Sequence, residues 1–172
     1  SLHLVPVSGL SNFWILNLFN IETLAIAFFA IGCLSFPLFY QILVFLGFEE
    51  TRRKWMLLLF AVVPSVNIYL LVSIDALVLT STLIFLLGMA RIYRQHKIDT
   101  ASFLLITLGL ILTNLLTFSG LFLFALLGFV SLYFLLKGQW SFVWLSLMSA
   151  IIFVMTFVLI YATTGYNQLE TF

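Results

Sequence analysis

The stretch WMLLLFAVVPSVNIYLLVSIDALVLTSTLIFLLGMARIY, from Trp55 to Tyr93, decides the fold class. It contains one charged side chain, Asp75, before Arg91 near its end. A helix needs about 20 apolar residues to cross about 30 Å of hydrocarbon. The stretch is long enough for two membrane spans. Pro64 and the polar residues that follow it predict the turn between these spans.

The same pattern continues on both sides of this stretch. Further apolar runs cover residues 22–46, 100–136 and 141–162, and short charged strings separate them. The middle run is long enough for two spans, with a break at Thr117 to Gly120, and Pro37 predicts a kink in the first run. The expected fold is an all-α, polytopic transmembrane helix bundle with six spans.

The composition supports a membrane protein. Hydrophobic residues make up 64% of the chain and charged residues 8%, whereas soluble domains carry about 25% charged residues. A net charge of +1 creates no field for binding phosphate backbones, which excludes nucleic acid as a partner. The single cysteine, Cys33, excludes a disulfide framework and a cysteine-based metal site.

The basic residues predict the orientation. With six spans, every Lys and Arg falls on one face, and loops rich in these residues stay cytoplasmic. Residues 1–21, with a short interfacial helix around Trp14, and the tail 163–172 then lie on the periplasmic or lumenal side. We therefore expect an integral protein of a bacterial inner membrane or an ER-type membrane, in contact with membrane lipid.

Several function classes do not fit the pattern. Proton relays and voltage sensors keep ionisable residues in mid-membrane, whereas the charges here lie at span ends. His3 and His96 fall on opposite sides of the bilayer, which excludes a haem held by two histidines. The sequence has no nucleotide-binding motif and no zinc-protease motif.

Asp75 is the principal candidate site residue. It stands at the predicted outer start of the third span, where an aspartate caps a helix well. The same carboxylate could instead lie at the mouth of an outward-facing cavity and hold a divalent cation or a substrate hydroxyl. Both readings stay open, and they are compatible. The secondary candidates are Asn67, Ser73 and Asn114, which are expected at this outer end together with the polar Thr117.

A family resemblance begins at Pro64. The string from Leu58 to Ser65, the Ser73-Ile-Asp75 turn and the apolar span ending in Gly88-Met-Ala-Arg-Ile-Tyr93 resemble the multi-spanning glycosyltransferases of the GT-C class. This class includes the dolichyl-phosphate-mannose protein mannosyltransferases and the lipid A aminoarabinose transferase. The resemblance covers roughly residues 21–136. It implies a polyprenyl-phosphate-linked sugar donor and, near Asp75, a divalent cation such as Mg²⁺ or Mn²⁺.

The chain departs from the family in two places. Thr117 stands where the family often has a basic residue. The first outer loop of the family carries the catalytic carboxylate, but residues 1–20 contain no Asp or Glu. We therefore expect the catalytic base to lie outside this chain, which would then be a fragment or a processed protein acting with other segments or subunits. The alternatives are a non-enzymatic accessory or scaffold subunit of a membrane complex and, more weakly, part of a transporter.

Overall fold

The computed structural model describes residues 21–63, 75–117 and 121–164, without the side chains at 21, 22, 24, 75 and 164. These residues are almost entirely helical, with no strand among them. The expected interfacial helix near Trp14 and the tail 163–172, beyond its first residues, lie outside the described part of the chain. The all-α class is therefore confirmed for the residues that are described.

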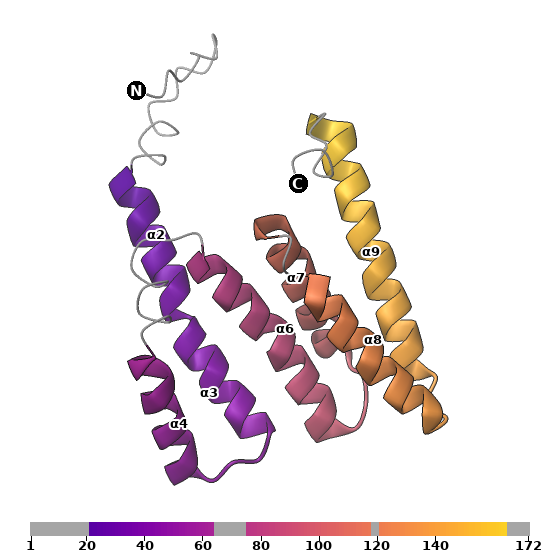
Figure 1. The fold of residues 1–172 in the computed structure, drawn as a ribbon, viewed down its shortest axis with the longest axis horizontal. Helices are drawn as coiled ribbons and strands as arrows, with labels where there is room; N and C mark the ends of the chain where they lie inside the picture. Colours follow the sequence, from indigo (N-terminus) through magenta and orange to yellow (C-terminus); the bar gives the residue numbers. More distant parts are fainter. Residues whose placement is uncertain (1–20, 64–74, 118–120, 165–172) are drawn as a thin grey trace.

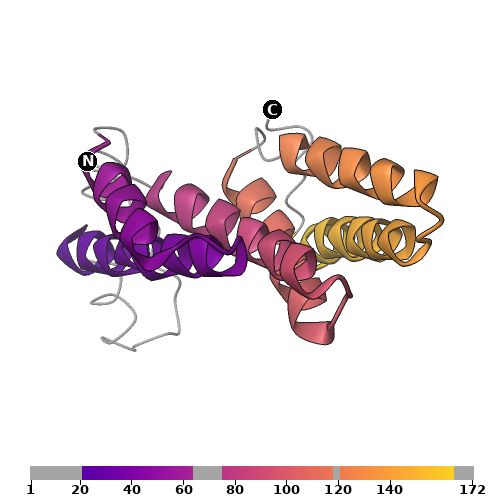
Figure 2. The ribbon, with the colours of Figure 1, turned by 90° about the horizontal axis from the view of Figure 1, so that it is seen from below.

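The helices run up and down in one bundle (Figure 1). They follow the chain in this order: α2 (Ile21–Cys33), α3 (Ser35–Phe45), α4 (Glu50–Val62), α6 (Asp75–Gln95), α7 (Thr100–Leu116), α8 (Leu121–Leu136) and α9 (Ser141–Thr164). α6 and α7 lie in the middle, with α3 and α4 on one side and α8 and α9 on the other (Figure 2).

Fewer helices than expected are long enough to cross a membrane. Within the described ranges, three apolar helical stretches qualify by length and composition: Ala25–Phe45, Ala76–Gln95 and Ser141–Thr163. α7 and α8 are apolar but have only 17 and 16 residues, or about 25 Å at about 1.5 Å per residue. The expectation of six full-length spans is thus met only in part.

The connections that follow α3, α6 and α8 all lie at one end of the bundle, which we call the basic end (Figure 1). Each has, within its first two residues, one in the left-handed backbone region: Gly47 with φ 80°, His96 with φ 53° and Gly138 with φ 77°. Glycine adopts this conformation without steric cost, and it ends helices well. All seven Lys and Arg residues stand in or next to these connections. The structure thus gathers the basic residues at one end, as the sequence predicts.

The first long helical stretch is interrupted at Leu34, which separates α2 from α3. Pro37 falls in the first turn of α3, where its missing N–H has little cost. The backbone N–H of Leu34 donates to the carbonyl of Ile31 at 3.0 Å, which tightens the last turn of α2. Thr80 of α6 also reaches this carbonyl, with its hydroxyl 3.1 Å away. The predicted irregularity near Pro37 is present and is held by a neighbouring helix.

Two glycines allow α6 and α7 to approach closely. A Cβ atom on Gly109 would come within 2.5 Å of the backbone nitrogen of Phe85. A Cβ atom on Gly88 would come within 2.7 Å of the side chain of Ile106. Small residues serve this purpose in membrane helices, because they let two backbones pack against each other. Phe85 and Ile106 belong to the main buried cluster of the bundle.

The outer helices are much less buried. α4 has no buried residue, and α9 exposes large apolar side chains along most of its length. In water such surfaces would be a liability, but in a bilayer lipid tails solvate them at no cost. The exposed faces are therefore consistent with a membrane protein.

Candidate functional site

The candidate residues at the end opposite the basic connections are only partly described. Asp75 is the first residue of α6, which agrees with its expected place at a helix start, but its side chain lies outside the description. Asn67 and Ser73 also lie outside the described residues. The two readings of Asp75, as a helix cap or as a carboxylate at a cavity mouth, therefore both stand as predictions.

Asn114 lies at this same end of the bundle, in the last turn of α7. It is 3% exposed, and its side-chain amide donates to the carbonyl of Leu110 at 2.9 Å. The neighbouring Thr113 donates its hydroxyl proton to the hydroxyl of Ser81 at 2.9 Å. Ser81 is six residues beyond Asp75 on α6, a rise of about 9 Å. The structure thus brings Asn114 and the start of α6 into the same part of the bundle.

Thr117 ends α7, and its backbone N–H donates to the carbonyl of Thr113 at 2.9 Å. Within the ranges that the structure describes, no three His, Cys, Asp or Glu side chains gather where they could hold a metal ion. Since the Asp75 side chain is outside those ranges, a divalent cation at Asp75 stays a prediction.

Pairs of buried hydroxyl groups join neighbouring helices, a feature that the sequence reasoning did not anticipate. Ser81 and Thr113 join α6 to α7 in this way. The other pairs join α3 to α6, α7 to α9 and α8 to α9: Ser35 with Thr80 at 3.1 Å, Thr107 with Ser149 at 3.1 Å, and Ser131 with Ser146. Such hydroxyls bond across helices because the bilayer interior offers no water.

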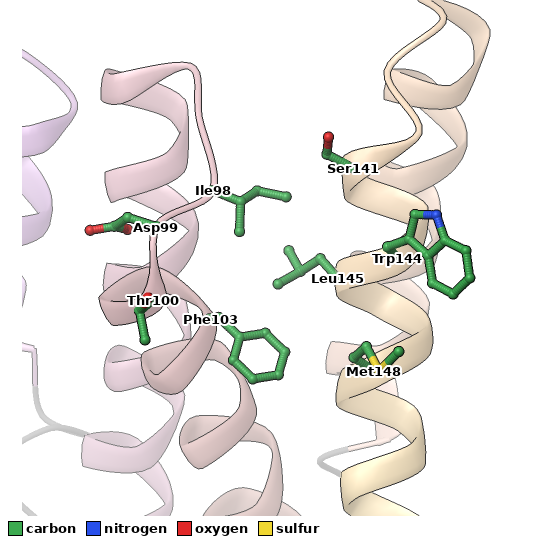
Figure 3. A pocket seen from close by; sticks show the side chains of 8 residues that line it. All are labelled: Ile98, Asp99, Thr100, Phe103, Ser141, Trp144, Leu145 and Met148. Atoms are coloured by element: carbon green, nitrogen blue, oxygen red, sulfur yellow. The ribbon is translucent and has the colours of Figure 1, made fainter.

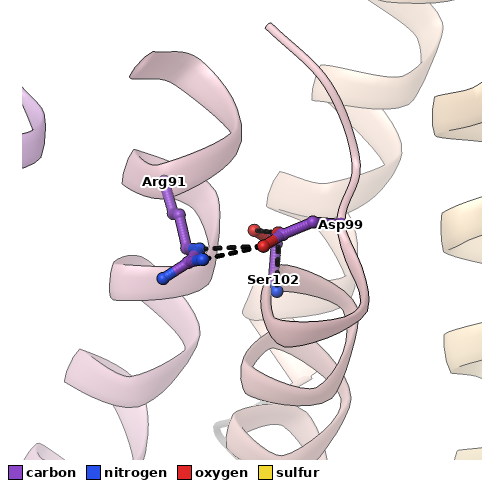
Figure 4. A network of polar contacts seen from close by, with 3 residues as sticks. All are labelled: Arg91, Asp99 and Ser102. Atoms are coloured by element: carbon purple, nitrogen blue, oxygen red, sulfur yellow. Dashed lines mark hydrogen bonds and ion pairs between the residues drawn. The ribbon is translucent and has the colours of Figure 1, made fainter. Parts of the chain in front are cut away.

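The basic end contains a fixed ion pair that the sequence reasoning also missed (Figure 4). Asp99 caps α7, where it accepts a hydrogen bond from the backbone N–H of Ser102 at 3.0 Å and another from the Ser102 hydroxyl. Its other oxygen accepts from Nε and Nη2 of Arg91 on α6, at 3.2 and 2.8 Å. The Ser102 hydroxyl and the Arg91 guanidinium hold the pKa of Asp99 well below its ordinary value.

The signals for this pair were available in the sequence. Asp99 stands three residues before a serine at the start of an apolar run, which is typical of a capping residue. Because Arg91 ends one helix and Asp99 begins the next, a tight antiparallel hairpin brings them together. The pair therefore fastens the α6–α7 connection at its basic end.

A pocket of about 450 Å³ opens beside this connection (Figure 3). It lies between the first turns of α7 and α9. Ile98, Phe103 and Leu145 point into the gap, and Trp144 stands on the far side of α9 from it. The lining is mainly apolar and consists of Ile98, Asp99, Thr100, Phe103, Ser141, Trp144, Leu145 and Met148. The cavity that we expected beside Asp75 is thus not the one described here, which lies at the opposite end of the bundle.

The chain matches no model of a known protein family, no curated protein and no solved structure. Its residues and their geometry are therefore the basis for any functional proposal.

Proposed function

We propose that this chain is a membrane-embedded part of a GT-C-like glycosyltransferase that takes a sugar from a polyprenyl-phosphate carrier. The observation that carries the proposal is the position of Asp75 at the start of α6. The start of α6 lies at the end of the bundle away from the basic connections, which is also the end where the buried Asn114 lies. The sequence resemblance to GT-C enzymes covers this same hairpin.

The proposed reaction is a displacement at the anomeric carbon of the sugar. An acceptor hydroxyl attacks this carbon and loses its proton to a general base outside this chain. The bond from the carbon to the phosphate oxygen breaks, and the lipid phosphate leaves with the electron pair. A divalent cation held by Asp75 would stabilise the negative charge on the leaving phosphate. The apolar surfaces between helices would hold the polyprenyl tail.

We further propose that the chain crosses the membrane six times. The six crossings are α2 with α3 as one, and then α4, α6, α7, α8 and α9. The gathering of every Lys and Arg at one end supports this arrangement, with that end cytoplasmic. The first residue of α2 and the last of α9 lie at the opposite end, which would be periplasmic or lumenal. α7 and α8 are short for a full span, and a bilayer that thins locally around them accommodates such helices at modest cost.

The test compares two aspartates at opposite ends of the bundle. Because the proposed base lies outside this chain, the test uses membranes in which the chain works with the segment or subunit that supplies the base. These membranes receive polyprenyl-phosphate mannose or polyprenyl-phosphate aminoarabinose with a radioactive sugar, and transfer to endogenous acceptors is measured. We expect Asp75→Asn to lower transfer at least about tenfold, since a charge that stabilises a transition state contributes this much or more. Asparagine also caps helices, so folding should be kept.

Asp99→Asn is the matched control, because it likewise replaces an aspartate at a helix start. We expect it to retain transfer. Equal transfer by the unchanged chain and Asp75→Asn would remove Asp75 from the mechanism.

The second candidate function is that of an accessory or scaffold subunit, and the exposed faces of α4 and α9 favour it. A subunit of this kind needs apolar surface for partner helices and no chemistry. The same assay separates the two proposals. A complete absence of sugar transfer from both lipid donors, in membranes that hold the folded chain together with the segment or subunit that supplies the base, would support the role of an accessory subunit.

A further inference from the structure

The pocket between α7 and α9 has the features of a lipid site rather than of a buried cavity. Its volume of about 450 Å³ lies within the usual range for small-molecule sites, about 300–1,000 Å³. Three apolar side chains point into it: Ile98, Phe103 and Leu145. Such a lining suits a hydrocarbon chain.

Two tryptophans indicate the depth of the pocket in the membrane. Trp144 lines the pocket and is 57% exposed, and Trp140 precedes the start of α9 and is 64% exposed. Exposed tryptophans of membrane proteins concentrate at the level of the lipid headgroups. The pocket therefore opens where a phospholipid changes from its polar headgroup to its acyl chains.

The charges around the pocket favour a negative headgroup. Lys97 directly precedes Ile98 of the lining, and Lys137 begins the connection that leads into Ser141. Both lysines are exposed, and among the described residues no carboxylate forms an ion pair with either. Asp99 is the acidic residue of the lining, and Arg91 already neutralises it at 2.8 Å. The positive charge next to the pocket is thus available to a ligand.

We propose that this pocket binds an anionic membrane phospholipid, with an acyl chain between α7 and α9 and the phosphate near Lys97 and Lys137. The site is separate from the one proposed at Asp75, because it lies at the other end of the bundle. It would bind lipid whether or not the chain transfers sugar. The occupant is a bilayer lipid, and its recognition depends on the headgroup charge.

Trp144, at the edge of the pocket, provides a fluorescent probe next to the site. A variant with Trp14→Phe, Trp55→Phe and Trp140→Phe leaves Trp144 as the one tryptophan of the chain. In phosphatidylcholine vesicles, its fluorescence is titrated with phosphatidylglycerol or phosphatidylcholine that carries bromine on the acyl chains. We expect brominated phosphatidylglycerol to quench the Trp144 fluorescence at a several-fold lower mole fraction than brominated phosphatidylcholine. Equal quenching by the two brominated lipids would overturn the proposal.

Charge variants test the role of the lysines. A basic residue near a membrane surface contributes about a fivefold preference for anionic lipid. Lys97→Gln and Lys137→Gln should each lower the preference for phosphatidylglycerol by about this factor. Lys54→Gln is the matched control, because Lys54 is at the basic end but pairs with Glu50 on α4. It should leave the quenching of Trp144 unchanged.

A blocking variant separates a pocket from general surface charge. Thr100 and Ala101 are adjacent and exposed in the first turn of α7, but only Thr100 lines the pocket. Thr100→Phe should fill the pocket and abolish the preferential quenching, whereas Ala101→Phe should keep it. A preference for phosphatidylglycerol that survives Thr100→Phe would show that lipid gathers by surface charge alone, and the proposed site would be wrong.

Discussion

The helices α6 and α9 are of similar length but have very different surroundings. The span in α6 has a mean hydropathy of 1.8, and 44% of its most apolar stretch is buried. The span in α9 has a mean hydropathy of 2.5, and only 11% of the corresponding stretch is buried. The more apolar helix is thus the less buried one, which is the reverse of what a soluble protein shows.

This difference shows what brings helices together in a bilayer. Lipid tails are as apolar as leucine side chains, so apolar character alone does not drive helices to associate. α6 has Gly88 for close approach and the hydroxyls of Thr80 and Ser81 for bonds to two neighbouring helices. α9 has no glycine, and its hydroxyl bonds to neighbouring helices, through Ser146 and Ser149, stand in its first half. In its second half, Thr156 and Thr163 bond to carbonyls of α9 itself. Small and polar residues, rather than hydropathy, decide which helix becomes the centre.

The largest effect should come from filling the contact between α6 and α7. Gly109→Ala would place a Cβ atom 2.5 Å from the backbone nitrogen of Phe85 and 2.7 Å from its Cβ atom. Neither atom is at the end of a flexible side chain, so the two helices must separate. We expect the free energy of unfolding in lipid bicelles to fall by about 2 kcal/mol.

Gly128→Ala in α8 is the matched control for this substitution. A Cβ atom there would meet nothing within 4 Å. Since alanine favours helices over glycine, this variant should gain up to about 1 kcal/mol of stability. If Gly109→Ala were as stable as Gly128→Ala, the close packing of α6 on α7 would be contradicted.

A smaller effect should follow from removing a hydroxyl bond between helices. Thr113 and Ser81 are 2.9 Å apart and buried. A double-mutant cycle with Thr113→Val and Ser81→Ala should give a coupling of about 0.6 kcal/mol, the average for such bonds in membranes. Thr163→Val in α9 should change stability little, because its hydroxyl is exposed. If the stability losses of Thr113→Val and Ser81→Ala simply added in the double variant, the hydrogen bond between these two hydroxyls would be contradicted.

The smallest effect concerns the ion pair of Asp99 with Arg91 at the α6–α7 connection, whose contribution to stability depends on pH. The pKa of Asp99 is lowered from its ordinary value of 3.8, because the folded state favours the carboxylate. The stabilisation is therefore complete above about pH 4 and is lost as the pH falls through the lower pKa of the folded state. Between pH 7 and pH 3, the thermal midpoint of the unchanged chain should fall further than that of Asp99→Asn, which has no carboxylate at this position to protonate.

Glu50→Gln is the control for this pH dependence. Glu50 pairs with Lys54 at 2.7 Å, but both side chains are exposed, and such pairs contribute little to stability. The thermal midpoint of Glu50→Gln should therefore change with pH in the same way as that of the unchanged chain. Identical acid sensitivity of Asp99→Asn and the unchanged chain would show that Asp99 does not stabilise the hairpin.

Much of the architecture could be predicted from the sequence. The apolar runs predict the positions of the helices, and the charged strings between them predict where the helices end. Gly47 and Gly138 stand just after the ends of α3 and α8. The number of full-length spans was overestimated. Length was judged from the apolar runs, which include the connecting residues, whereas the helix α7 ends at Leu116. Hydropathy also does not indicate which helix is central, as α6 and α9 show.

The site was less predictable than the fold. Asp75 was correctly placed at a helix start, but the helix periodicity of α7 does not reveal that Asn114 is buried while nearby Leu115 is exposed. The pocket beside Asp99 lies between the first turns of α7 and α9, two helices that also contact each other at Thr107 and Ser149. Such contacts between distant segments leave no local signal in the sequence.

The break at Leu34 has a consequence for biosynthesis. Ser35 and the carbonyl of Ile31 have their partner in Thr80, which follows 45 and 49 residues later in the chain. A ribosome therefore completes α2 and α3 well before it makes the hydroxyl that holds the interruption. Until then, the Ile31 carbonyl has the N–H of Leu34 as a donor, but the interruption lacks the second bond that comes from α6. The first part of the chain to be inserted should thus acquire its final shape only when α6 arrives beside it.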